Sequence, residues 1–93
     1  MNRKAVQVRV HGRVQGVGYR LWARDEAISL GLAGWVRNEQ DGTVTALIAG
    51  TEAAVSTMIA RLWQGPESAS VSKVDAEEFD AGSLPAGFRI NTP

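Results

Sequence analysis

The stretch Gly12-Arg-Val-Gln-Gly-Val-Gly-Tyr-Arg20 joins a segment of alternating apolar residues to an amphipathic one. Its glycines, at positions 12, 16 and 18, allow positive φ and let the backbone turn its N–H groups inward. We expect a helix to begin at about Tyr19, which would point its unpaired first-turn N–H groups and the positive end of its dipole at this loop. The Arg20 guanidinium matches phosphoryl oxygens two at a time. The stretch therefore predicts an anion site.

The composition indicates one globular domain over residues 1–93, with a hydrophobic fraction of 44% and a charged fraction of 22%. The chain begins with Met and has no cysteine, which excludes disulfides, thiolate metal sites and cysteine nucleophiles. No apolar run approaches the roughly 18 residues of a membrane span. We therefore expect a cytoplasmic monomer with no membrane partner.

Charge is distributed unevenly along the chain, although the net charge is zero. Six basic residues precede the first acid, Asp25: Arg3, Lys4, Arg9, Arg13, Arg20 and Arg24. This asymmetry suits an anionic ligand, but solvated strand and loop arginines explain it equally well. The balanced remainder favours a local positive site over a long nucleic-acid footprint, so no nucleic-acid partner is expected.

Hydrophobic periodicity predicts a strand and then a helix around the loop. Residues 5–12 alternate, with Val6, Val8 and Val10 on the face expected to be buried. After the loop, an apolar stripe with helical spacing comprises Tyr19, Ala23, Ala27 and Leu30, with Trp22 beside it. Gly31 follows where a C-terminal left-handed residue is expected.

Two strand-like segments, 32–39 and 43–49, flank Gln40-Asp-Gly42 and predict a hairpin. A two-residue Asp-Gly turn would pair Gln40 with Thr43. A three-residue loop with Gly42 left-handed would pair Glu39 with Thr43 instead. We favour the second, because it puts the β-branched residues on one buried face and Trp35 on the other.

The second half of the chain predicts a helix and two strands. Thr51 is the expected N-cap of the helix, whose apolar stripe places Met58 and Trp63 in the core, and Gly65-Pro66 should end it. Residues 71–79 form a strand pattern without constant parity, which predicts a bulge. Turn residues at 81–87 precede a short edge strand at 88–91.

This order of elements is typical of a ferredoxin-like α+β plait, in which two helices cover one face of a sheet of four to five strands. A right-handed crossover makes the first two strands parallel, so that both end at one edge of the sheet. Asn38 ends the second strand on the helix-covered face. We therefore expect Asn38 to lie beside the glycine loop, although the two are distant in sequence.

At this point the sequence resembles the acylphosphatase family. The stretch Val10-His-Gly-Arg-Val-Gln-Gly-Val-Gly-Tyr-Arg20 is similar to the family's phosphate-loop signature. The residues Gly34-Trp-Val-Arg-Asn38, with the following Gly42-Thr-Val44 and Gly50, are similar to the family's second motif. The family's length and element order account for nearly the whole chain. Tyr19 departs from the phenylalanine more usual in the family, and its hydroxyl should be tolerated.

The resemblance implies metal-independent, cofactor-free hydrolysis of small acyl phosphates to a carboxylate and inorganic phosphate. It assigns phosphate binding to Arg20 and positioning of the attacking water to Asn38. It also implies a five-stranded sheet whose last strand lies at an edge. The backbone N–H groups that would wrap the phosphoryl oxygens belong to Val14, Gln15, Gly16, Val17, Gly18, Tyr19 and Arg20.

Other functions fit the sequence less well. His11 is the only histidine and is expected on the exposed strand face, so no Ser-His-Asp triad or metal cluster can be assembled. The main alternative is a non-catalytic ferredoxin-like module that binds an anion or RNA. A base-stacking sheet needs aromatic residues on both central strands, and here Trp35 stands alone. A third possibility is a domain of a larger carbamoyl-transfer enzyme. We consider it less favoured, because the chain begins with Met and its pattern of elements makes a full domain.

Overall fold

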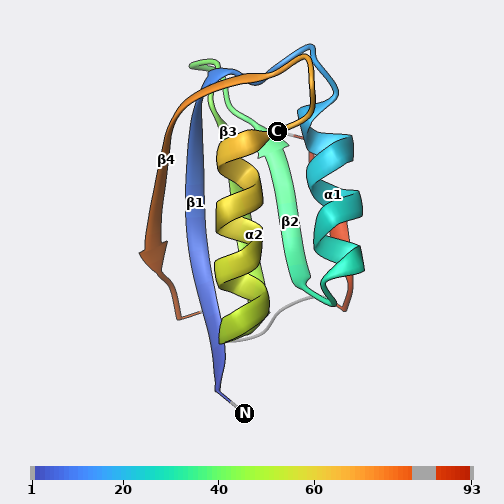
Figure 1. The fold of residues 1–93 in the computed structure, drawn as a ribbon, viewed down its shortest axis with the longest axis vertical. Coiled ribbons are helices and arrows are strands. Elements are labelled where there is room, and N and C mark those ends of the chain that lie inside the picture. The colour runs from blue at the N-terminus through green and yellow to red at the C-terminus, as the bar shows by residue number, and fades with distance from the viewer. Residues whose placement is uncertain (1, 81–85, 93) are drawn as a thin grey trace.

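The computed structural model of the protein describes residues 2–80 and 86–92, which form a five-stranded sheet with two helices on one face (Figure 1). The elements, in chain order, are β1 (Arg3–Arg13), α1 (Tyr19–Ser29), β2 (Ala33–Asn38), β3 (Val44–Thr51), α2 (Glu52–Gln64), β4 (Ser70–Glu78) and β5 (Phe88–Ile90). The strands lie in the order β4-β1-β3-β2-β5. The predicted ferredoxin-like α+β fold is confirmed. Within the described residues, no helix is long and apolar enough to cross a bilayer.

Strand β3 determines where the loop and the end of β2 lie. It pairs antiparallel with both β1 and β2, so these two strands run in the same direction. The carboxyl ends of β1 and β2 therefore meet at one edge of the sheet. Figure 1 shows the blue loop after β1 at the same end of the molecule as the arrowhead of β2.

The hairpin between β2 and β3 has the three-residue loop that we favoured. Asn38 pairs with Val44, and the Glu39 N–H donates to the Thr43 carbonyl at 2.9 Å. Gly42 has a φ of +92°, as this loop requires. This register places Val36 in the core and leaves Asn38, two residues further along β2, on the same helix-covered face.

The core lies between the sheet and the two helices, as the periodicities predicted. Alternating strand residues supply one side, and the apolar stripes of α1 and α2 supply the other. Its main members are Val6, Val8, Val10, Val36, Val44, Ile48, Tyr19, Ala23, Ala27, Val55, Met58 and Leu62. Thr51 caps α2 as expected, because its hydroxyl accepts a hydrogen bond from the Ala54 N–H at 3.2 Å.

One core prediction is wrong. Trp63 keeps 48% of its surface exposed. The buried stripe of α2 follows Val55, Met58 and Leu62, and Trp63 is turned about 100° from Leu62 on a helix of 3.6 residues per turn. Trp63 therefore lies outside the stripe of α2 that packs on the sheet.

The broken parity of β4 is a β-bulge, as predicted. His11 pairs with Lys73 and Gly12 pairs with Val71, so Ser72 is the extra residue on β4. Gly12 has a φ of +123°, and a Cβ there would collide with the Ser70 carbonyl. Strand β5 lies at the sheet edge as expected, and the predicted turn at 81–87 falls mostly outside the described residues.

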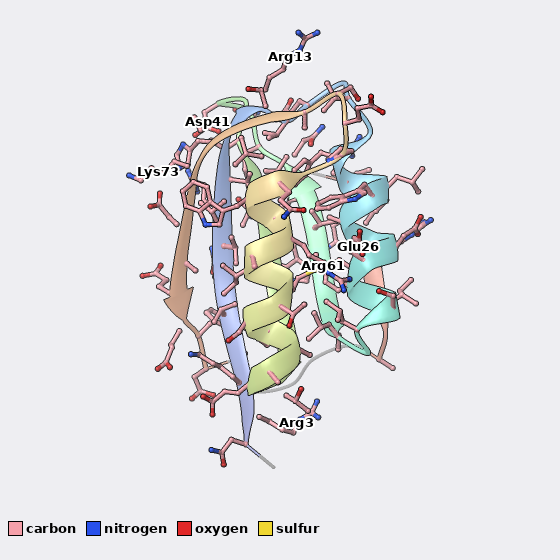
Figure 2. The ribbon with its side chains drawn as sticks, viewed as in Figure 1. Arg3, Arg13, Glu26, Asp41, Arg61 and Lys73 are labelled. Carbon is pink, nitrogen blue, oxygen red and sulfur yellow. The ribbon has the colours of Figure 1, made fainter. Side chains whose placement is uncertain are left out.

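The two helices contact each other through one ion pair and one buried hydroxyl. Figure 2 shows Arg61 of α2 and Glu26 of α1 pointing toward one another, with Nη1 and Oε2 2.8 Å apart. The Tyr19 hydroxyl donates to the Leu62 carbonyl at 2.7 Å. That carbonyl belongs to the last turn of α2, where carbonyls lack intrahelical donors. Burial raises the pKa of Tyr19, which therefore remains a neutral donor.

We predict that Tyr19→Phe destabilises the protein while preserving the fold. The Leu62 carbonyl would lose its donor in a buried environment, which costs about 1–3 kcal/mol. Urea denaturation followed by circular dichroism measures the change, and Trp63→Phe at an exposed position serves as the control. Equal unfolding free energies for Tyr19→Phe and the wild type would show that the hydroxyl contributes no net stability.

Candidate functional site

A cavity of about 190 Å³ lies at the end of the sheet where the loop meets β2. It is lined by Val14, Gly16, Gly18, Tyr19, Arg20, Leu21, Asn38 and Ile90. Arg20 and Asn38 therefore lie at one site, as the crossover predicted. A larger hollow of about 420 Å³ runs along β1 and β4, but its arginine, Arg9, already pairs with Asp41 at 3.4 Å. The smaller cavity is the stronger candidate.

The loop turns its backbone toward this cavity through two left-handed glycines. Gly16 and Gly18 have φ values of +72° and +79°, which a residue with a side chain adopts only with strain. The first hydrogen bond of α1 runs from the Trp22 N–H to the Gly18 carbonyl at 3.1 Å. The N–H groups of Tyr19, Arg20 and Leu21 therefore have no acceptor within the helix. They form the positive end of α1, which has no acidic residue in its first turn.

Arg20 adds a full positive charge at this end of the helix. Its side chain is half-buried, and no carboxylate in residues 2–80 or 86–92 forms an ion pair with it. The helix dipole makes a cation here unfavourable by about 0.3–1 kcal/mol. An anion in the cavity would offset this cost and would give Arg20 an ion-pair partner.

The other basic residues of the N-terminal segment contribute less to the site. Lys4, Arg9 and Arg24 pair with Glu78, Asp41 and Asp25, respectively. Figure 2 shows Arg13 pointing away from the molecule beyond the end of β1. Most of the N-terminal basic residues are therefore surface residues that serve no common site, and the local positive charge at the cavity comes from Arg20.

Asn38 lines the same cavity, and its side-chain oxygen is buried. Its Oδ1 accepts no hydrogen bond from any described residue. A buried polar atom without a hydrogen-bond partner lowers the free energy of unfolding by about 1–3 kcal/mol, so a donor to this oxygen would be stabilising. A water molecule that reached this oxygen would supply that donor.

Gln15 has a role that the sequence did not reveal. Its Nε2 donates to the carbonyls of Glu39 at 2.8 Å and Thr43 at 2.9 Å, both in the hairpin turn that follows Asn38. The side chain therefore joins the glycine loop to the strand end that carries Asn38. The local sequence around Gln15 does not distinguish an amide that binds a ligand from one that binds a turn. Only the predicted crossover, which brings the loop close to the end of β2, indicated that such a contact could form.

Five of the seven predicted loop residues line the cavity, and Gln15 and Val17 do not. The Val17 carbonyl accepts a hydrogen bond from the Ser68 hydroxyl at 3.2 Å, which attaches the loop to the connection after α2. In Figure 1 that connection arches beside the loop at the same end of the molecule. Phosphate binding by the seven N–H groups stays a prediction.

The turn that receives Gln15 is itself held by Asp41. The Asp41 carboxylate accepts hydrogen bonds from the Thr43 hydroxyl at 2.6 Å and the Thr43 N–H at 3.0 Å. These bonds, with Arg9 nearby, lower the pKa of Asp41. Their contribution to stability is present above the ordinary pKa of an aspartate and is lost as the pH falls through the lowered value.

His11 lies outside the cavity, as expected for an exposed strand residue. Its Nε2 is 3.0 Å from Asp75 Oδ2 across the β1–β4 pair. Within the described part of the chain, no three His, Cys, Asp or Glu side chains are grouped so as to hold a metal ion. The positive groups of the cavity are Arg20 and backbone N–H groups.

The fold and the cavity define a ferredoxin-like α+β protein with a cavity at one edge of its sheet, beside the N-terminus of α1 and Arg20. Residues 6–90 match the sequence model of the acylphosphatase family, and the chain belongs to that family. It is 64% identical over 88 residues to an acylphosphatase of Mesorhizobium japonicum, covering 95% of this chain and 94% of the relative. The predicted family is confirmed, and with it an enzyme class rather than a binding module.

Solved structures agree with this assignment. An acylphosphatase from Coxiella burnetii has a TM-score of 0.92 and 36% identity, covering 97% of this chain and 94% of its own. An acylphosphatase from Bacillus subtilis has a TM-score of 0.89 and 33% identity, covering 94% of this chain and 97% of its own. The similarity thus extends over nearly the full length of all three chains.

We predict that Arg20→Gln weakens the binding of inorganic phosphate by roughly 10- to 100-fold, since a hydrogen bond to a charged group contributes about 1.5–3 kcal/mol. Calorimetric titration with phosphate measures the change. Arg24→Gln is the matched control, because Arg24 also lies on α1 but pairs with Asp25 and does not line the cavity. Equal losses in the two variants would contradict a specific role for Arg20.

Proposed function

We propose that the protein hydrolyses the carboxyl–phosphate bond of small acyl phosphates and releases a carboxylate and inorganic phosphate. Family membership supports the reaction class. The observation that carries the proposal is a single cavity lined by both an arginine without a described carboxylate partner and an asparagine whose buried amide oxygen has no described donor. The first suits a phosphoryl group, and the second suits a water molecule.

In the proposed mechanism, Arg20 and the N–H groups of residues 14–20 hold the phosphoryl oxygens. Asn38 Oδ1 accepts a hydrogen bond from a water molecule and aligns its oxygen with the phosphorus. As the water–phosphorus bond forms, the bond from phosphorus to the carboxylate oxygen breaks and its electron pair leaves with the carboxylate. The phosphate product or solvent takes the proton.

This arrangement needs no general base and no leaving-group acid. An acyl phosphate is a mixed anhydride whose carboxylate leaves readily, and a loose, metaphosphate-like transition state needs mainly charge stabilisation and an aligned nucleophile. The helix terminus and Arg20 would supply the positive potential that a metal ion supplies elsewhere. The proposal therefore includes no metal and no cofactor.

The proposed substrate and product are small molecules, and neither a nucleic acid nor a membrane takes part. We propose that residues 1–93 act as one domain, as a monomer and in the cytoplasm. Every group in the mechanism comes from this one chain, so the chemistry requires no second subunit.

The direct test compares the turnover of benzoyl phosphate and phenyl phosphate, an ordinary phosphate monoester, in the presence of EDTA. We expect hydrolysis of benzoyl phosphate alone, because the site provides no acid for the poorer leaving group of a monoester. Turnover of neither compound, or turnover that requires an added metal, would overturn the proposal.

We predict that Asn38→Ala separates binding from turnover. Phosphate affinity should stay close to that of the wild type, while kcat on benzoyl phosphate falls by on the order of 10²-fold or more, because misalignment of a reacting group carries a cost of that size. Stability should change by only about 1 kcal/mol. Asn91→Ala is the control, since Asn91 directly follows the last residue of β5 but does not line the cavity. A parallel loss of affinity, kcat and folded structure would indicate a purely structural asparagine.

A further inference from the structure

The apolar side chains of Leu21 and Ile90 line the same cavity as the phosphoryl-binding groups, and the proposed reaction has no use for them. Leu21 lies in the first turn of α1 and Ile90 is the last residue of β5. Ile90 pairs with Val36, which places both on the helix-covered face of the sheet. The cavity therefore has charged and polar groups from the loop, Arg20 and Asn38, and apolar surface from two other positions.

Leu21 is placed differently from an ordinary exposed leucine. Leu21 is 51% exposed and borders the proposed anion site. Apolar surface does not stabilise an anion or the water around it, so the phosphoryl group alone does not account for a leucine at this position. Ile28, two turns later on the same helix, is similarly exposed at 56% but lines no part of the cavity. Scattered exposed apolar residues need no explanation, whereas one that forms the wall of a polar cavity suits a ligand that is itself partly apolar.

The acyl phosphate of the proposed reaction is such a ligand. Its phosphoryl end carries the charge, and its acyl end must extend away from the N–H groups and guanidinium that hold that charge. Within the lining of the cavity, the surface suited to a hydrocarbon is that of Leu21 and Ile90, together with Val14 at the buried side of the loop.

We propose that Leu21 and Ile90 form an acyl-group subsite that favours apolar acyl phosphates, aliphatic or aromatic, over those with a small polar acyl group. This inference rests on the proposed function and adds the substrate class to it. The cavity of about 190 Å³ must also hold the phosphoryl group, so the subsite is shallow and open to solvent. Each methylene that leaves water can improve kcat/KM by up to roughly 4-fold, and partial burial gives less.

The test measures kcat/KM for acetyl, butyryl and hexanoyl phosphate in the wild type, Leu21→Ser, Leu21→Met and Ile28→Ser. We expect kcat/KM to rise with chain length in the wild type. The hexanoyl-to-acetyl ratio should fall several-fold in Leu21→Ser and be retained in Leu21→Met, which keeps an apolar side chain. Ile28→Ser is the matched control and should retain the ratio. The same ratio in Leu21→Ser and the wild type would overturn the subsite.

A second measurement separates this inference from the proposed function. Hexylphosphonate and methylphosphonate are not hydrolysed, so calorimetric titration compares their binding whether or not the enzyme turns over acyl phosphates. Tighter binding of hexylphosphonate that is lost in Leu21→Ser supports the subsite even if no acyl phosphate is hydrolysed. Equal binding of the two phosphonates by the wild type would overturn it even if hydrolysis is confirmed.

Discussion

The antiparallel pairing of β3 with both β1 and β2 is the constraint on which the candidate site depends. It makes β1 and β2 parallel, so the loop that leaves β1 and the turn that leaves β2 emerge at one edge of the sheet. Helix α1 must then begin at that edge and cross back over the sheet, which points its N-terminus at the end of β2. This topology alone places Arg20 and Asn38 at one cavity, without a direct interaction between the two side chains.

The cavity concentrates three features that ordinarily reduce stability. A cation lies at the positive end of a helix, a buried amide oxygen has no described donor, and two residues adopt left-handed backbone. Glycine at positions 16 and 18 removes the last of these costs. An anion and a water molecule would remove the other two together. A folded chain retains such a set when binding compensates for it, which is why the arrangement favours a ligand site over an accident of packing.

The sequence predicts what periodicity, turn length and topology determine. Alternation placed Val6, Val8 and Val10 in the core, and loop length selected the register that brings Asn38 to the cavity. It could not predict contacts that depend on how packed elements meet in space. The exposure of Trp63 depends on how α2 is rotated about its own axis against the sheet, and the partner of Gln15 depends on the separation of two loops. These distances follow from the whole core, which no local pattern encodes.

Three contacts that the sequence did not predict act together on the loop. Gln15 binds the hairpin turn, Ser68 binds the Val17 carbonyl, and the Tyr19 hydroxyl binds the end of α2. Fixing the backbone of one residue costs roughly 1–2 kcal/mol of conformational entropy, and a glycine-rich loop has more of this freedom to lose than most. Because these contacts restrict the loop during folding, a ligand at the proposed site would not have to order it on binding. Positive groups aimed in advance at a developing charge stabilise a transition state more effectively than groups that must first reorient. The side chains around the cavity thus matter to its chemistry through the backbone that they hold in place.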